Sequence, residues 1–159
     1  MLVDYLKMQC SAGAQALQLF DSWVGCLGPH DYEKYILPYS RRVFEGLKDT
    51  GVPLINFSTG TSTMLDLVQK AGGDVLSFDW RIEMDTARAL LGKDQPVQGN
   101  LDPVTLFGPL PLIRERVHDI LKRSGGKSYI FNLGHGILQH TPVEHVKAVV
   151  DMVHEYKHE

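Results

Sequence analysis

The feature that most constrains the fold is a short apolar run followed by a segment with helical spacing, which occurs five times along the chain. The apolar runs are Ala16–Phe20, Pro53–Phe57, Val75–Asp79, Pro96–Asn100 and Tyr129–Leu133. Each run has the length of a strand, and the apolar residues after it recur every three or four positions, as on one buried face of a helix. Repeated strand-then-helix units predict parallel strands joined by right-handed crossovers. The sequence therefore predicts an α/β fold, either an open sheet or part of a (β/α)8 barrel.

Two of the predicted helices carry signals for where they bend or begin. The first has its apolar face at Tyr32, Ile36, Tyr39, Val43 and Leu47. Pro38 should bend this helix or divide it in two, because proline removes a backbone hydrogen bond. The last helix is expected to open at Thr141–Glu144, with Thr141 capping a free amide and Glu144 completing a capping box. Its buried stripe is expected at Val146, Val149, Val150 and Val153.

Composition excludes several classes of protein. The chain has 159 residues, of which 43% are hydrophobic and 22% charged, as expected for one soluble globular domain. The net charge of -3 and the lack of a basic stripe argue against a nucleic-acid partner. The apolar runs are too short to cross a membrane, and Asp4 and Lys7 interrupt the region where a secretory signal would need an apolar stretch. We therefore expect a cytoplasmic protein. Cys10 and Cys26 have no metal-ligand spacing and are expected to be free thiols.

Polar residues follow each predicted strand, at the edge where parallel α/β folds bind ligands. They are Asp21 and Ser22, Ser58–Thr61, Asp79–Arg81, Asn100–Asp102, and His135. His135 lies between two glycines, which would let the backbone turn sharply and approach a ligand closely. We expect these residues to form one ring.

Each candidate also has a structural interpretation. Ser22 suits the cap of a following helical segment, Asp102 before Pro103 suits a helix start, and Arg81 suits a solvated surface. The segment Phe57–Thr63, with sequence FSTGTST, could hold an anion at a helix start. It lacks the lysine of a P-loop, so a Ser/Thr cap is the preferred interpretation. No GxSxG motif is present, which argues against acyl transfer at a serine.

The segments AQALQLFDSWVGCLGPHDYEKYILPY, LSFDW, VQGNLDP and NLGHGI, the last followed by TPVEHV, occur in this order. Together they resemble the C-terminal part of the uroporphyrinogen decarboxylase family over nearly the whole chain. The resemblance implies that residues 1–159 form about the last five units of one (β/α)8 barrel, with Leu2–Cys10 matching the helix before the fourth barrel strand. It implies a homodimer that uses neither metal nor organic cofactor. The implied reaction removes carbon dioxide from four acetate side chains of uroporphyrinogen, giving coproporphyrinogen.

The resemblance also assigns two substrate-binding residues. The family's substrate-binding serine or threonine falls on Ser22 in FDSW, and its active-site histidine falls on His135 in NLGHG. The family's arginine motif, pyrrole-facing aspartate and substrate-binding tyrosine correspond to a portion before Met1. Asp79 and Asp102 are not expected to replace that aspartate. We therefore expect the chain alone to be nearly inactive, and poorly soluble because a partial barrel has free strand edges.

Two other functions remain open on the sequence. One is a corrinoid-dependent methyltransferase of the same fold, which would hold zinc through cysteine and histidine; the sequence has no cysteine after Cys26. The other is a half-barrel that binds tetrapyrroles without turnover.

Overall fold

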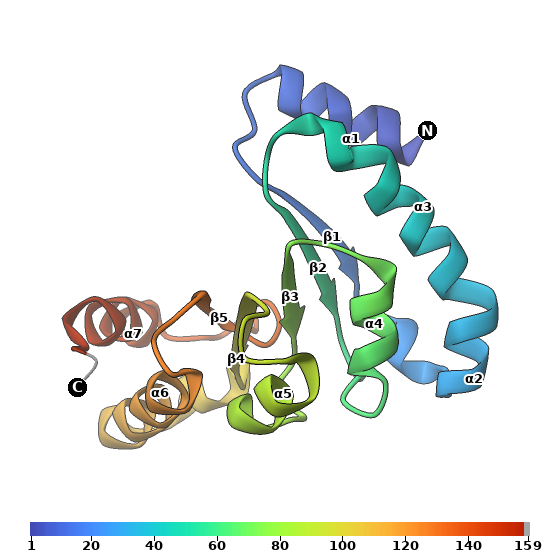
Figure 1. The fold of residues 1–159 in the computed structure, drawn as a ribbon. Coiled ribbons are helices and arrows are strands. Elements are labelled where there is room, and N and C mark those ends of the chain that lie inside the picture. The colour runs from blue at the N-terminus through green and yellow to red at the C-terminus, as the bar shows by residue number, and fades with distance from the viewer. Residues whose placement is uncertain (158–159) are drawn as a thin grey trace.

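The computed structural model describes residues 1–157 and shows a single parallel sheet with helices on one side (Figure 1). The strand order β1-β2-β3-β4-β5 follows the order in the chain. The five strands are β1 (Leu17–Asp21), β2 (Leu54–Ser58), β3 (Val75–Phe78), β4 (Val97–Leu101) and β5 (Tyr129–Leu133). The helices are α1 (Leu2–Ser11), α2 (Pro29–Asp31), α3 (Leu37–Leu47), α4 (Leu65–Ala71), α5 (Met84–Leu91), α6 (Leu110–Ser124) and α7 (Val143–Glu155). The predicted α/β class, the five parallel strands and the helix after each strand are confirmed.

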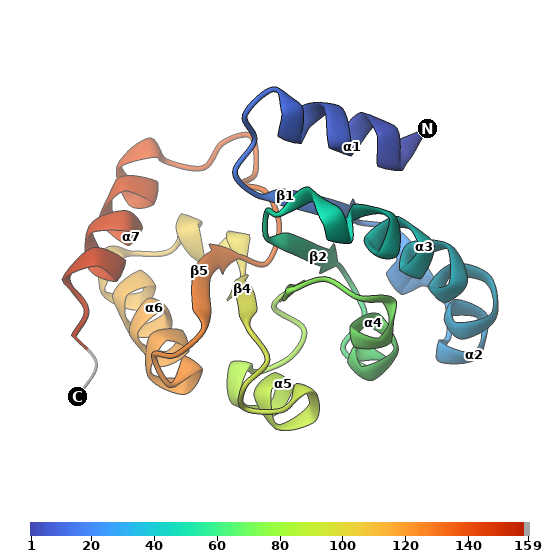
Figure 2. The ribbon, with the colours of Figure 1, turned by 45° about the horizontal axis from the view of Figure 1, so that its top comes forward.

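The sheet is curved, and helices α3 to α7 follow one another along its convex side (Figure 2). Neighbouring strands pair in parallel, from Leu17 opposite Leu54 in the first pair to Val97 opposite Tyr129 in the last. The curvature also shows in a side-chain contact across the sheet. Gln98 on β4 donates a hydrogen bond to the side chain of Gln18 on β1, although β2 and β3 lie between these strands.

The apolar core lies between the sheet and the helices. Val97 from β4, Ala87 from α5, and Ile113 and Val117 from α6 have no exposed surface. The opposite, concave face of the sheet is more polar and more open, because side chains alternate along each strand. There, Gln98 also donates to the Ser77 hydroxyl at 3.0 Å. Within the described residues 1–157, no helix is long and apolar enough to cross a membrane.

The helix after β1 is divided, as Pro38 predicted. A π-helical turn spans Tyr32–Ile36, and α3 begins at Leu37 with Pro38 in its first turn. The predicted buried stripe is wrong at Tyr39, which is 64% exposed, whereas Leu37 and Phe44 are buried. The wider π-helical turn explains the error, because it changes the phase of the helix relative to a regular 3.6-residue repeat.

The expected capping box of the last helix is wrong. Helix α7 begins at Val143, its N-cap residue is Pro142, and no side chain caps it. The Thr141 hydroxyl is instead buried without a hydrogen-bond partner among the described residues, and Glu144 pairs with Lys147 at 3.2 Å. The predicted stripe holds at Val149, which is buried, but Val150 is 47% exposed.

Candidate functional site

Loops after four of the five strands meet around one cavity of about 480 Å³. Its described lining residues are Ser22, Trp23, Thr59, Trp80, Arg81 and His135. Ser22 follows β1 and His135 follows β5, the two strands at opposite edges of the sheet. In a flat sheet, strands four positions apart would be separated by roughly 19 Å. The curvature of the sheet therefore brings the two residues to the same cavity.

His135 crosses over the ends of the strands toward β2. Its ring centroid lies 6.1 Å from that of Phe57 on β2. The preceding Gly134 is buried, and a Cβ atom there would lie 2.8 Å from the Trp80 nitrogen and 3.0 Å from the Asp79 Cα. Gly134 permits close packing against the loop after β3, and a Cβ on Gly136 would meet nothing within 4 Å. The close approach of a ligand to this turn stays a prediction.

Asp79 joins the loops that form the cavity wall. Its side chain is 2% exposed and accepts hydrogen bonds from the Gly60 amide at 2.7 Å and the Arg81 amide at 3.1 Å. The same carboxylate forms an ion pair with the Arg81 guanidinium. A buried carboxylate is stable only when it is hydrogen-bonded and paired, and these contacts meet that need. Asp79 thus holds the loops after β2 and β3 together.

Arg81 is held on two sides. Besides its ion pair with Asp79, its guanidinium carbon lies 4.5 Å from the centroid of the Trp80 ring, a cation–π arrangement. The Arg81 side chain nevertheless remains 51% exposed. Arg81 is thus exposed, as its structural interpretation predicted, and its guanidinium is also held in place.

Ser22 is positioned by a contact with the loop after β2. The Thr59 hydroxyl donates a hydrogen bond to the Ser22 carbonyl at 2.8 Å. The N-cap residue of the short helical turn Val24–Cys26 is Trp23, which makes no side-chain cap, and the Asp21 carboxylate accepts from the Val24 amide at 3.0 Å. The Ser22 hydroxyl thus has no capping role in that turn. No side chain caps α4, so the Ser/Thr cap expected within Phe57–Thr63 is not found. The Ser58 and Thr61 hydroxyls instead form a hydrogen bond with each other at 2.8 Å.

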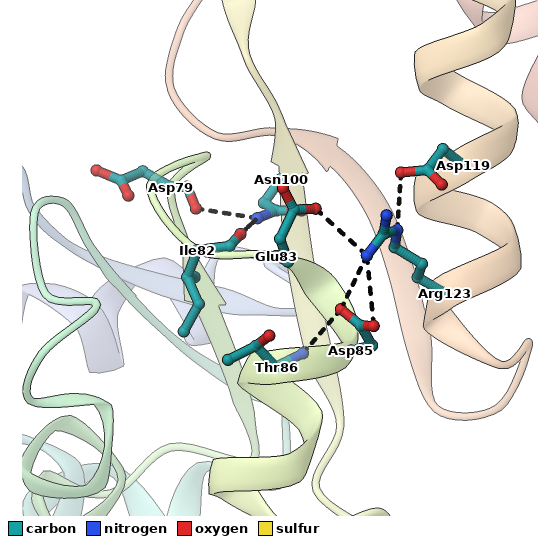
Figure 3. Close-up of polar contacts among 8 residues, drawn as sticks. All are labelled: Asp79, Ile82, Glu83, Asp85, Thr86, Asn100, Asp119 and Arg123. Carbon is teal, nitrogen blue, oxygen red and sulfur yellow. Dashed lines mark hydrogen bonds and ion pairs between the residues drawn. The ribbon is translucent and has the colours of Figure 1, made fainter.

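Asn100, near the end of β4, and Asp102, directly after it, belong to a different part of the structure. The Asn100 amide donates to the carbonyls of Asp79 at 3.0 Å and Ile82 at 2.7 Å, which fixes the loop after β3 (Figure 3). Asp102 accepts from the Val104 amide at 2.9 Å and so caps the turn Pro103–Phe107, as its structural interpretation predicted. Both line a neighbouring pocket that contains neither Ser22 nor His135. The expected single ring is therefore formed in part.

The cavity carries groups suited to an anionic ligand. A serine hydroxyl, an imidazole and a guanidinium can all donate hydrogen bonds to carboxylate oxygens. The described residues 1–157 contain no group of three His, Cys, Asp or Glu side chains arranged to hold a metal ion.

Sequence reasoning included Thr59 among the ring candidates but missed Trp23 as a lining residue and the role of Asp79. Trp23 is 85% exposed, and nothing in its sequence pattern separates it from an ordinary surface residue. Thr59 and Asp79 were within the predicted loops, but their contacts join residues distant in sequence. The sequence signal that could have pointed to this wall of the cavity was the Trp80-Arg81 dipeptide, which directly follows a predicted strand.

The family model described as uroporphyrinogen decarboxylase (URO-D) matches residues 1–156. The chain is 56% identical to the uroporphyrinogen decarboxylase of Carboxydothermus hydrogenoformans, over 96% of this chain and 44% of that protein. It is 52% identical to the enzyme of the same name from Thermus thermophilus, over 97% of this chain and 45% of that protein. The chain thus spans a little under half the length of these relatives.

A likeness in three dimensions extends to a solved methyltransferase from Methanosarcina mazei. The TM-score is 0.84 at 20% sequence identity, and the match covers 97% of this chain and 46% of that one. At this identity the likeness shows the fold alone, one that the chain shares across all five βα units. The match of the family model to nearly every residue is the stronger finding, and by it the chain belongs to the uroporphyrinogen decarboxylase family.

Proposed function

We propose that this chain forms the C-terminal part of a uroporphyrinogen decarboxylase, which converts uroporphyrinogen III to coproporphyrinogen III by removing four carboxyl groups. The observation that carries the proposal is the cavity shared by Ser22 and His135. The two family motifs that contain these residues lie at opposite ends of the chain, and the fold brings them together. The proposed enzyme is a cytoplasmic homodimer that needs no metal or organic cofactor.

The proposed role of the cavity is to bind and orient an acetate side chain. The substrate carries eight carboxylates, and the Ser22 hydroxyl can donate a hydrogen bond to one of them. His135 can donate as a neutral ring or pair with an anion when protonated. His135 is exposed at the cavity surface, so it is accessible to a ligand.

The reaction itself relies on the substrate as an electron sink. The bond between the acetate methylene and its carboxyl carbon breaks, carbon dioxide leaves, and the electron pair passes into a protonated pyrrole ring. A proton then adds to the methylene carbon, which becomes a methyl group, and the ring releases the proton that it had gained. The protein supplies orientation and the placement of charge. We propose that the arginine, aspartate and tyrosine implied by the resemblance come from the barrel units that this chain does not span.

Anaerobic turnover of uroporphyrinogen tests the proposal. The chain is assayed alone and mixed with a separately produced N-terminal half of a relative, and the products are oxidised to porphyrins and separated by chromatography. We expect coproporphyrin to form in the mixture and little from the chain alone. His135→Ala should lower turnover by about 10- to 100-fold, because a hydrogen bond to a charged group is lost.

His140→Ala is the matched control, since His140 is an exposed histidine of the same loop that does not line the cavity. Equal turnover by the His135 and His140 variants would contradict the assignment of His135. A well-folded mixture without any decarboxylation would contradict the proposed function. Full activity of the chain alone would show that the family's aspartate is dispensable.

A further inference from the structure

Arg81 supplies the fixed positive charge among the described residues that line the cavity. The resemblance assigns it no role. We propose that Arg81 binds a carboxylate of the substrate in the cavity that it shares with Ser22 and His135, and that Asp79 and Trp80 position its guanidinium for this task. The inference rests on the proposed function for the identity of the substrate, but the anion site itself follows from the contacts of Arg81.

The guanidinium is anchored at a defined place. Asp79, which is 2% exposed, pairs with the Nη1 nitrogen of Arg81, and the Trp80 ring lies 4.5 Å from the guanidinium carbon. Asp79 is itself fixed by the amides of Gly60 and Arg81. A long side chain normally loses rotamer entropy when it binds a ligand, and anchoring in advance reduces that loss.

The anchoring leaves binding capacity unused. A guanidinium has five N–H donors in a planar fork, and the contact with Asp79 involves the Nη1 end of it. About half of the Arg81 side chain, 51%, remains exposed although the Asp79 beneath it is buried. An arginine whose sole role was to neutralise Asp79 would gain nothing from this exposure. The remaining donors suit a second carboxylate in the bidentate geometry that arginine favours.

Tryptophan fluorescence offers a local measurement of binding. The sequence has two tryptophans, and both, Trp23 and Trp80, line the cavity. Two probes are titrated into the full chain: uroporphyrin III, an air-stable octacarboxylate, and tricarballylate, a small carboxylate without a ring. The variants are Arg81→Gln, Arg81→Lys and the control Arg42→Gln. Arg42 is exposed on α3 and is not among the residues that line the cavity.

We expect Arg81→Gln to raise the dissociation constant for both probes by about tenfold, as expected for loss of a charge-assisted hydrogen bond at a partly exposed site. Arg81→Lys should weaken binding less, because it keeps the charge but loses the fork. Arg42→Gln removes the same charge elsewhere and should leave both constants unchanged. Melting temperatures are measured for all variants, because a role confined to stabilising Asp79 would change these without changing the affinity of folded protein.

The outcomes separate this inference from the proposed function. Unchanged uroporphyrin binding in Arg81→Gln would overturn the inference and leave the function standing. Arg81-dependent binding of tricarballylate without binding of uroporphyrin would uphold the anion site and count against the function. Binding of neither probe to the unmodified chain would overturn both. If Arg81→Gln does not fold, Arg81→Lys decides, and wild-type affinity for both probes in that variant would overturn the inference.

Discussion

Gly134 shows how a single missing side chain determines the position of His135. A Cβ atom at residue 134 would lie 2.8 Å from the backbone nitrogen of Trp80 and 3.0 Å from the Cα of Asp79. These are backbone atoms, which cannot rotate away as a flexible side chain would. The loop after β5 can therefore pack on the loop after β3 only when residue 134 is a glycine.

Gly134→Ala should lower the free energy of unfolding by about 1–3 kcal/mol, because it forces atoms into a packed contact. Gly136→Ala is the matched control, since a Cβ there meets nothing within 4 Å, and its effect should stay within about 0.5 kcal/mol. Urea denaturation of the two variants measures the difference. Equal stabilities would show that the loop after β5 can move off the loop after β3.

Tyr32 makes the free energy of unfolding depend on pH in the alkaline range. Burial, with the negative charge of Asp21, raises the pKa of Tyr32 from 10.0 to about 12. Above pH 10 the unfolded chain loses this proton while the folded chain retains it, so the unfolded state is favoured increasingly up to about pH 12. The stability lost over this interval is up to about 3 kcal/mol, at about 1.4 kcal/mol for each pKa unit.

Tyr32→Phe should remove the part of the alkaline loss of stability that comes from this tyrosine. The measurement is the change in free energy of unfolding between pH 9 and pH 11.5. Tyr39→Phe provides the control, because Tyr39 is 64% exposed. The two variants and the unmodified chain share every lysine that titrates in the same range. A Tyr32 variant that loses as much stability as the unmodified chain would contradict the assignment.

At the residue scale, the sequence predicted roles that depend on near neighbours better than those that depend on distant ones. Asp102 caps the turn that follows it, and the presence of Pro103 was sufficient to predict this. The pairing of Asp79 with Gly60 and its packing against Gly134 depend on three separate loops. No local pattern contains that information, so the sequence placed Asp79 among the ring candidates without predicting that it joins the loops.

At the scale of elements, the strands were predicted closely because each is a short apolar run bounded by glycine, proline or polar residues. The last, Tyr129–Leu133, has the predicted limits. Helix starts were harder to predict. The signals at Thr141 fitted a capping box, but the N-cap residue of α7 is Pro142 and no side chain caps the helix. The phase of the stripe after Tyr32 was lost because a π-helical turn has no strong sequence signal.

Strand β1 forms one edge of the sheet and carries a large apolar side chain on its surface. Phe20 is 66% exposed, and unpaired edge strands are sites of association between chains. We expect the isolated chain to self-associate at micromolar concentration. Phe20→Lys should reduce this association, because a charged residue on an edge strand opposes pairing.

Sedimentation velocity measures the change in the fraction of monomer. Tyr39→Lys is the control, as Tyr39 has a similar exposure of 64% but lies on helix α3. A soluble monomer of the unmodified chain at micromolar concentration would contradict the expectation. An equal increase in the monomer fraction for the two variants would show that the effect comes from net charge and not from the edge strand.

At the scale of the whole molecule, the sequence predicted the topology but not the curvature. Five strand-then-helix units lead to parallel strands in chain order, which the structure confirms. The contact between Gln18 and Gln98 depends on how far the sheet bends, and bending results from the twist of all strands together. The meeting of Ser22 with His135 could therefore be expected from a barrel resemblance, but not from the spacing of apolar residues.

The agreement between strand order and chain order has a consequence for biosynthesis. Each described strand pairs with the strand that comes next in the chain, so a nascent polypeptide can add one βα unit at a time to the units already made. The cavity is different, since Ser22 belongs to the first unit and His135 to the last. A ribosome-bound intermediate can thus hold four paired strands while it still lacks the histidine, and the cavity would form only after the fifth of these units has been made.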